Sequence, residues 1–473
     1  MTGFLREALP IAVQVCFLYL ALTYVLFAAQ LFVAVLENVR RYREERIEDY
    51  QLLASSRFTV PVSVVFPAYN EAAVILSCVR SALAFEYFEY EVIVVNDGST
   101  DDTLAVLVAA FDLHPHQVFY RPTLPTEGVR GIYRSALEPR LIVVDKVNGG
   151  NKADALNVGV NLSRYRYVCC LDSDTMYERD ALLKSMRLAV ADPARVVGVT
   201  SVFTVGLHPE RQGSVRDEKR RLDRSLLMNF QQLEYVRSFL NNRAAWSRLN
   251  YMMCCSGGFM IWRRDLLVEL GGFARSFTCE DIEMTFRVHE RMLRERRPYR
   301  VLSLPDTVAT TEGPAHLTAL VSQRARWQRV ILETVWHYRR MFLNPKYRTV
   351  GLLGMPFYVI TEALAPLFEL LAALTLVLAV ATGLFDLRQF LFFVGAVSML
   401  NASFTIAGLV IQDRLMREVR WSDLLRLVLI SPLELIIYRP LLMYAALRGT
   451  VAAFRGKKGW DKFDRNLRPA PAG

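Results

Sequence analysis

Two aspartates one residue apart follow a short apolar run in the stretch VCCLDSD, Val168–Asp174. Side chains alternate along an extended chain, so Asp172 and Asp174 lie on the same side of it. At the exposed end of a strand, two such carboxylates form a hard oxygen site for a divalent cation such as Mg²⁺ or Mn²⁺. An Asp-x-Asp pair also occurs in solvated loops, but other stretches of this chain favour the metal site.

Two strand-like runs nearer the N-terminus also end in polar residues. In VVFPAYNE, Pro67 is expected to end the strand ladder, Tyr69 offers a flat ring and Glu71 a carboxylate. A nucleoside base can stack on such a ring and hydrogen-bond to the acid, although a plain strand-to-helix turn has the same pattern. In VVNDGST, Asp97 stands at the strand end and Gly98 permits a tight turn. Asp97 is a candidate contact to uracil or ribose, or alternatively a helix N-cap.

A glycine-rich turn precedes a helix start in NGGNKADALN, residues 148–157. Backbone N–H groups at a helix N-terminus attract phosphate, and Lys152 adds a positive charge there. The GK[ST] ending of a Walker A loop is absent, so the pattern argues against a nucleoside triphosphatase.

A second glycine pair and two adjacent acids lie further along the chain. Gly257 and Gly258 open SGGFMIWRRDLLVELGGF, in which glycine pairs flank a helix-like core, and glycine lets the backbone approach a ligand closely. Glu280 and Asp281 precede an amphipathic helix, where adjacent acids commonly favour the helix N-terminus. Either acid is also a candidate general base for an acceptor hydroxyl, and Asp281 is our choice.

The stretch QRARW, Gln323–Trp327, joins guanidinium groups to an indole. Arg324 and Arg326 are suited to clamp a pyrophosphate, because guanidinium groups bind phosphate oxygens in pairs. Trp327 supplies a flat apolar face for stacking a sugar ring. A basic amphipathic helix at a membrane surface would explain the same residues.

Alternating strand-like and helix-like runs are expected to position these motifs. Helical patterns cover 72–84 and 101–111. Such alternation predicts an α/β fold with a mainly parallel sheet, whose ligands lie outside the carboxyl ends of the strands. The predicted strands are Val62–Phe66, Val92–Asn96, Leu141–Val144, Val168–Leu171 and Val196–Thr200.

Membrane-spanning segments flank this polar region. The chain has 473 residues, is 53% hydrophobic and carries a net charge of +10. Residues 10–36 contain no charge, which is enough to cross the bilayer, and the basic run that follows predicts that this end lies in the cytoplasm. Because arginines cluster beside apolar segments, membrane lipid explains much of the charge, and no nucleic-acid partner is expected. The seven cysteines fit a reducing compartment.

Three apolar segments follow the polar region. Residues 351–385 read as an interfacial helix that runs into a span, and residues 390–411 as a second span. Residues 424–446 are interrupted by prolines and charges, and are either a crossing, a re-entrant hairpin or two short crossings. The predicted boundaries are an N-terminal transmembrane helix at 1–43, a cytoplasmic catalytic domain at 44–346, interfacial and transmembrane helices at 347–452, and a basic tail at 453–473.

Taken together, YNE, NDGS, NGGNKADALN, DSD, ED and QRARW resemble the membrane-embedded, processive family 2 glycosyltransferases. That group includes the cellulose, hyaluronan, chitin and poly-N-acetylglucosamine synthases. The resemblance covers roughly Pro61–Trp327 and the flanking helices, and its QxxRW element is typical of the processive members. It implies a GT-A-like fold, a UDP-sugar donor, Mg²⁺ or Mn²⁺, and a multi-pass protein of the inner membrane with a cytoplasmic catalytic domain.

The resemblance also implies a role for each matching residue. Asp281 would be the base, beside Glu280. Asp172 would contact the nucleotide, and Asp174 would coordinate the metal with it. One position departs from the pattern, since Cys279 stands where the family usually has threonine. The remaining implied contacts are to the donor, by Pro67, Tyr69, Glu71, Asp97, Lys152 and Arg326, and to the acceptor, by Trp327, Gly257, Gly258 and Gln323.

The expected activity is inverting, processive β-glycosyl transfer from UDP-N-acetylglucosamine or UDP-glucose, which extends and exports a polysaccharide. The expected partners are the donor, the growing chain, membrane lipid and export subunits. A single-transfer glycosyltransferase that acts on a membrane lipid is the alternative within enzymes. A catalytically inactive scaffold is the alternative outside them, and the intact set of aspartates argues against it.

Overall fold

A computed structural model of the chain describes residues 2–45, 59–173, 175–205, 222–311, 313–411 and 419–455. The chain divides into two compact units, each described by itself. The sheet unit comprises 42–214, 250–312 and 458–473, and the helical unit comprises 1–41, 215–249 and 313–457. The boundaries expected from the sequence stay a prediction.

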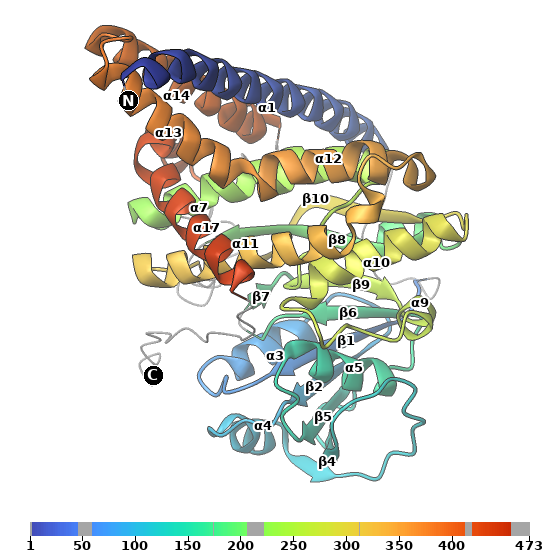
Figure 1. Cartoon of the computed structure of the whole chain (residues 1–473). Helices are drawn as coiled ribbons and strands as arrows, with labels where there is room; N and C mark the ends of the chain where they lie inside the picture. Colours follow the sequence, from blue (N-terminus) through green and yellow to red (C-terminus); the bar gives the residue numbers. More distant parts are fainter. Residues whose placement is uncertain are drawn as a thin grey trace. The chain divides into compact units, whose positions relative to one another are not determined.

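Four parallel strands form the centre of the sheet unit (Figure 1). They are β5 (Leu141–Lys146), β2 (Tyr90–Asn96), β1 (Val62–Ala68) and β6 (Tyr167–Leu171), in this spatial order. All residues of β1, β2 and β6 are buried, so these strands read as largely apolar runs in the sequence. The predictions of these four strands are confirmed, and their carboxyl ends meet at one edge of the sheet.

The whole sheet is mixed rather than mainly parallel. Among the described strands, four pairings are parallel and five are antiparallel. The strand β9 (Phe259–Arg263) runs antiparallel between β6 and β8 (Val196–Val205), which corrects the helix-like interpretation of its apolar core. The sheet is completed by β3 (Leu113–Pro115), β4 (Val129–Ser135), β7 (Thr175–Tyr177) and β10 (Arg300–Thr311).

Pro67 does not end the pairing of β1 on both sides. The strand β1 pairs with β2 through Pro67 and Ala68, whereas its pairing with β6 stops at Val65. Proline lacks an N–H group and therefore cannot donate to a neighbouring strand. The hydrogen-bonded ladder of β1 is therefore shorter on the side of β6 than on the side of β2. The loop after β1 begins beside the end of β2.

Helices cover the faces of the sheet. The helix α5 (Lys152–Leu162) packs against β1 and β2 so closely that a Cβ atom on Gly159 would lie 2.2 Å from the side chain of Val65. The sequence predicted the helical regions around α3 and α4. The described helices of this unit are α3 (Ile75–Leu83), α4 (Thr103–Phe111), α5, α6 (Ala181–Ala191), α9 (Arg264–Glu269) and α10 (Glu280–Arg294).

The helical unit contains the long apolar helices. Its α-helices are α1 (Thr2–Glu45), α7 (Leu226–Tyr235), α8 (Arg243–Leu249), α11 (Leu317–His337), α12 (Met355–Tyr358), α13 (Ala365–Ala381), α14 (Leu387–Ile411), α16 (Trp421–Ile430) and α17 (Arg439–Phe454). Short π and 3₁₀ segments continue or connect them: η2 (Val236–Asn242), η3 (Arg339–Met341), η4 (Pro345–Tyr347), η5 (Val350–Gly354), η6 (Val359–Ala363), η7 (Ser431–Leu433) and η8 (Glu434–Tyr438).

Three described helical runs are long and apolar enough to cross a membrane: Ala8–Arg40, Leu387–Val410 and Trp421–Phe454. A fourth candidate is a pair of helices, Val350–Ala363 and Ala365–Ala381, bent by 47°. Large apolar side chains of these helices are exposed, as in Leu18 and Phe392. The apolar segments expected from the sequence overlap all four candidates. The number of crossings and the side on which each loop lies stay predictions.

Candidate active site

Lys152 joins three segments of the sheet unit. It begins α5, and its Nζ lies 2.6 Å from Oδ1 of Asp172, which follows β6, and 2.9 Å from Oε1 of Glu280, which begins α10. The same ammonium donates to the carbonyl of Gly257 over 3.2 Å. Burial alone would lower the pKa of Lys152, but the Asp172 and Glu280 carboxylates raise it well above its ordinary value. The lysine therefore stays charged and holds these acids together.

Asp281 is fixed beside this cluster by two backbone donors. The N–H of Gly257 donates to Oδ2 of Asp281 over 2.9 Å, and the N–H of Ile282 donates to Oδ1 over 2.7 Å. Burial, and then the negative charge of Glu280, raises the pKa of Asp281 to about 6, against the opposing effect of Lys152. A carboxylate with this pKa is largely ionised at neutral pH and yet more basic than an ordinary aspartate, which suits a general base.

The two glycines after Ser256 stand where a larger residue would be crowded. A Cβ atom on Gly257 would lie 3.1 Å from Nζ of Lys152 and 3.2 Å from Oδ2 of Asp281. A Cβ atom on Gly258 would lie 3.2 Å from the ring of Phe203 and 3.3 Å from Oδ2 of Asp172. These glycines let the backbone pass between the charged side chains, so the close approach predicted from the sequence is made here to the protein's own residues.

Tyr177 is a site residue that the sequence analysis missed. Its hydroxyl accepts from the N–H of Asp172 over 2.8 Å, and lies 2.9 Å from the carbonyl of Asp172 and 2.8 Å from that of Gly258. The hydroxyl of this buried tyrosine thus connects the residue after β6 to the residue before β9. The tyrosine comes from β7, which the sequence analysis did not predict.

Asp97 and the glycine-rich turn after β5 are bonded to each other. The N–H of Gly149 donates to Oδ1 of Asp97 over 3.0 Å, and the N–H of Gly150 donates to Oδ1 of Asn148 over 2.7 Å. These two donors are used within the protein, and the expected binding of phosphate at the start of α5 stays a prediction. The helix α4 has Asp102 as its N-cap, so the alternative N-cap role for Asp97 is wrong.

The loops after β1 and β2 are also joined. The N–H of Asn70 donates to Oγ of Ser99 over 2.9 Å, and Oδ1 of Asn70 accepts from the N–H of Thr100 over 2.7 Å. Asn70 has φ +54°, a left-handed conformation that asparagine tolerates. The turn leaves the neighbouring Tyr69 ring 38% exposed, and Glu71 half-buried. Both side chains stay candidates for donor contact.

The expected metal site is described only in part. Asp174 lies outside the described residues, and the described residues hold no group of three or more His, Cys, Asp or Glu side chains arranged around a metal position. Asp172 stands at the end of β6 with 36% of its side chain exposed and one oxygen bonded to Lys152. Carboxylate oxygens are the ligands that Mg²⁺ and Mn²⁺ prefer, so the residues present fit such a cation.

QRARW lies on α11, in the helical unit. Arg324 is buried there and donates to Oε2 of Glu234 over 2.7 Å and to Oε1 of Gln323 over 2.8 Å. Its guanidinium carbon lies 3.9 Å from the centre of the Trp327 ring. Arg324 is therefore bound within the protein, and its expected role as a pyrophosphate clamp stays a prediction. Arg326 stays a candidate for that role.

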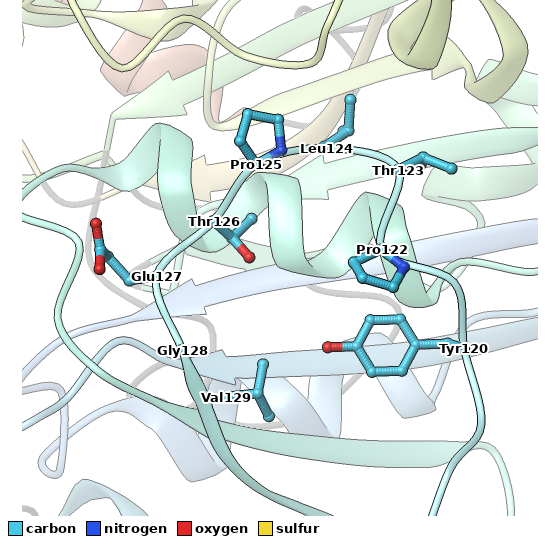
Figure 2. A pocket seen from close by; sticks show the side chains of 9 residues that line it. All are labelled: Tyr120, Pro122, Thr123, Leu124, Pro125, Thr126, Glu127, Gly128 and Val129. Atoms are coloured by element: carbon cyan, nitrogen blue, oxygen red, sulfur yellow. The ribbon is translucent and has the colours of Figure 1, made fainter.

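A pocket lies beside α5, inside the loop that joins β3 to β4 (Figure 2). Its volume is about 510 Å³. Asn161 of α5 holds the loop by accepting from the N–H of Leu124 over 2.9 Å and donating to its carbonyl over 3.0 Å. Figure 2 shows the Tyr120 ring pointing across the loop toward Val129. None of the residues expected from the sequence lines this pocket.

Comparison with known proteins identifies a family to which more than half of the chain is similar. Residues 60–329 match the family described as glycosyltransferase like family 2. A poly-beta-1,6-N-acetyl-D-glucosamine synthase of Staphylococcus aureus (strain COL) is 25% identical over 267 residues, which are 56% of this chain and 53% of that protein. The synthase of the same name from Staphylococcus epidermidis is 25% identical over 280 residues, 58% of this chain and 56% of that protein. The chain spans about half the length of these relatives.

A mannosyltransferase is among the solved structures that are similar over most of the chain. It is the mannosyltransferase PcManGT from Pyrobaculum calidifontis in complex with GDP-Man and Mn²⁺, with a TM-score of 0.51 and 19% identity. The likeness covers 89% of this chain and 99% of that one. At this identity it shows the fold alone, which is a GT-A-like mixed α/β fold.

Proposed function

Because the chain belongs to glycosyltransferase family 2 and is therefore a glycosyltransferase, we propose that it is an inverting, processive enzyme that uses a UDP-sugar. In this proposal UDP-N-acetylglucosamine or UDP-glucose is the donor, and the product is a β-linked polysaccharide. The names of the curated relatives favour N-acetylglucosamine. The whole activity is a proposal, since the chain spans about half the length of those relatives.

The observation that carries the proposal is the position of Asp281 next to the Lys152 cluster. The backbone N–H of Gly257 holds Asp281, while the carbonyl of the same residue accepts from Lys152. The ammonium of Lys152 in turn holds Asp172. The candidate base Asp281 thus bonds to Gly257 directly, and the candidate donor-binding acid Asp172 is connected to the same glycine through Lys152.

The proposed reaction is a single displacement. The acceptor hydroxyl oxygen attacks the anomeric carbon, Asp281 takes the hydroxyl proton, and the bond from that carbon to the phosphate oxygen breaks. UDP leaves with the bonding electron pair, and attack from the opposite face turns an α-linked donor into a β-linked product. A bound Mg²⁺ or Mn²⁺, held by Asp172 and Asp174, would supply positive charge to the leaving diphosphate.

Other residues of this chain would bind the two substrates. Tyr69, Glu71 and Asp97 would contact the nucleoside, and Arg326 would stabilise the negative charge of the diphosphate as it leaves. Trp327 would stack on the acceptor end of the growing chain. Lys152 would keep Asp172 and Glu280 in place through its charge.

The helical unit supports a membrane setting. Its candidate spans expose apolar side chains, and we infer that they cross the inner membrane with the catalytic domain in the cytoplasm. Export of the polysaccharide across the membrane, with export subunits as further partners, is part of this proposal. The second candidate function is a single transfer to a membrane lipid, which the same exposed apolar surface also favours.

The test is UDP release by the purified protein in nanodiscs, with Mg²⁺ or Mn²⁺, across a panel of UDP-sugars. Release with one sugar and a product of high mass would support the processive synthase and name its polymer. Release with a singly glycosylated lipid as the only product would favour the second candidate. Asp281→Asn is the matched inactive variant, and release that persists in it would contradict the proposed base.

A further inference from the structure

Lys146 is a fully buried cation that the proposed reaction does not use. It is the last residue of β5, and its side chain is 0% exposed. Its Nζ lies 2.5 Å from Oδ1 of Asp97, 2.6 Å from Oδ2 of Asp154 and 2.5 Å from the carbonyl of Val147. A lysine ammonium has three donor hydrogens, so these three acceptors use all of them.

The Lys146 contact falls on one oxygen of Asp97. Oδ1 of Asp97 also accepts from the N–H of Gly149. The backbone of Asp97 is held as well, because its N–H donates to the carbonyl of Ala68 over 2.8 Å and its carbonyl accepts from Asn148 over 2.8 Å. Among the described residues no donor is bonded to Oδ2 of Asp97. One oxygen of this carboxylate is therefore fixed by the protein, and the other is left for a ligand.

Asp154 is the second carboxylate bound to the Lys146 ammonium, and other residues of the protein bond to Asp154 in turn. It lies in the first turn of α5, where its N–H donates to the side chain of Asn151 over 3.0 Å. Its Oδ1 lies 3.3 Å from Nε of Arg275 and accepts from the N–H of Glu127 over 3.2 Å. The position of Asp154, and through it that of Lys146, is thus set by the protein alone.

We propose that Lys146 is a positioning residue for the donor nucleotide. By binding Oδ1 of Asp97, it turns Oδ2 toward the donor, where that oxygen accepts the imide N–H of a uracil ring. The inference rests on the proposed function, because it needs a uridine donor. Lys146 does not touch the nucleotide itself. A base without a donor N–H at that place would leave Oδ2 unpaired, which disfavours it.

A purely structural role predicts something different. Two buried carboxylates need a counter-charge, and removing a buried ionic partner is strongly destabilising. If Lys146 only balances charge, removing one carboxylate together with the lysine restores the protein. If Lys146 positions Asp97, the same double change restores stability but not nucleotide affinity, because the bond from the lysine to Oδ1 of Asp97 is still missing.

The experiment compares wild type, Lys146→Met and Lys146→Met/Asp154→Asn in the full-length protein in nanodiscs. Uridine alone and UDP with Mg²⁺ are the two probes, and melting temperature is read in parallel. Lys184→Met is the matched control, since Lys184 on α6 pairs with two acids just before that helix, at 3.2 Å from Glu178 and 2.9 Å from Asp180. That control is expected to lose some stability and to keep its affinity for both probes.

We expect both Lys146 variants to bind uridine and UDP at least tenfold more weakly, about 1.4 kcal/mol, and by a similar factor for each probe. The double variant should regain much of the melting temperature that the single variant loses. Wild-type affinity in either variant, or recovery of affinity together with stability in the double variant, would overturn the inference while leaving the proposed function intact. A wild-type protein that binds neither probe would overturn the proposed donor and the inference with it.

Discussion

Oδ2 of Asp281 lies 2.9 Å from the backbone nitrogen of Gly257. This hydrogen bond joins the first turn of α10 to the loop before β9. It fixes one carboxylate oxygen of the candidate base. The same loop residue accepts from Lys152, so a small movement of Gly257 changes both charged groups at once. The position of this loop is therefore as important to the site as the acids themselves.

Substituting Gly257 by alanine tests that relationship. The new methyl group would lie 3.1 Å from Nζ of Lys152 and 3.2 Å from Oδ2 of Asp281, so the two side chains must move by a few tenths of an ångström. We expect kcat to fall by about tenfold or more, because small displacements of reacting groups are costly. Gly128→Ala is the control, since no atom lies within 4 Å of its added Cβ. Equal kcat values for the two variants would contradict the prediction.

The pH dependence of the reaction should follow Asp281. Burial and the neighbouring Glu280 raise its pKa to about 6, and a base acts only when deprotonated. With the proposed UDP-sugar donor, kcat/KM should be nearly constant above about pH 7 and fall tenfold per pH unit well below 6, because kcat/KM reports the pKa values of the free enzyme. Asp281→Asn should lower kcat by about 10² or more while it retains donor binding. A profile of kcat/KM that stays flat down to pH 5 would exclude this aspartate as the base.

The sequence predicted the strands that are buried on both faces. It missed strands such as β9, whose conformation depends on pairing with neighbouring strands. The runs in β1, β2, β5, β6 and β8 are largely apolar, and no surface helix has such a pattern. The five residues of β9 are as apolar as a buried helix segment, so the pattern alone does not distinguish the two. Their antiparallel place between β6 and β8 is decided by tertiary pairing.

The same distinction applies to the site. Asp97 and Asp172 follow apolar runs and stand out in the sequence. Lys146 and Tyr177 matter partly through partners far away along the chain, Asp97 for the lysine and Gly258 for the tyrosine. A lysine at the end of the buried run LIVVDK was a signal, because lysine is seldom fully buried without a partner. Nothing comparable marks Tyr177. The internal use of Arg324 was equally hidden, since its partner Glu234 lies 90 residues earlier.

Thr285 is predicted to hold the loop before Gly257 in place. Its buried hydroxyl accepts from the N–H of Cys255 over 3.0 Å and donates to the carbonyl of Asp281 over 2.8 Å. Thr285→Val keeps the shape but leaves that N–H unpaired, which should cost about 1–3 kcal/mol in the free energy of unfolding. Thr285→Ser keeps the hydroxyl and is the control. Denaturant unfolding and kcat are measured together, and a serine variant as impaired as the valine variant would refute the hydrogen-bond explanation.

Trp327 distinguishes the processive reaction from a single transfer. Arg324 lies over one face of its ring, at 3.9 Å, so one face is already occupied and a sugar can stack only on the other. We expect Trp327→Ala to shorten the polymer and to raise the KM for an oligosaccharide of that polymer, used as acceptor, by up to about tenfold, with the donor KM unchanged.

The matched control is Trp336→Ala, on the same helix. This ring is 71% exposed and also has an arginine beside it, with Arg339 at 4.8 Å. Because both variants remove an indole from α11 beside an arginine, a general loss of helix stability would affect them alike. Shortened product in the Trp327 variant alone would support stacking of the acceptor on that ring. Unchanged turnover and an unchanged product size in it would instead favour a single transfer, in which no chain has to advance along the site.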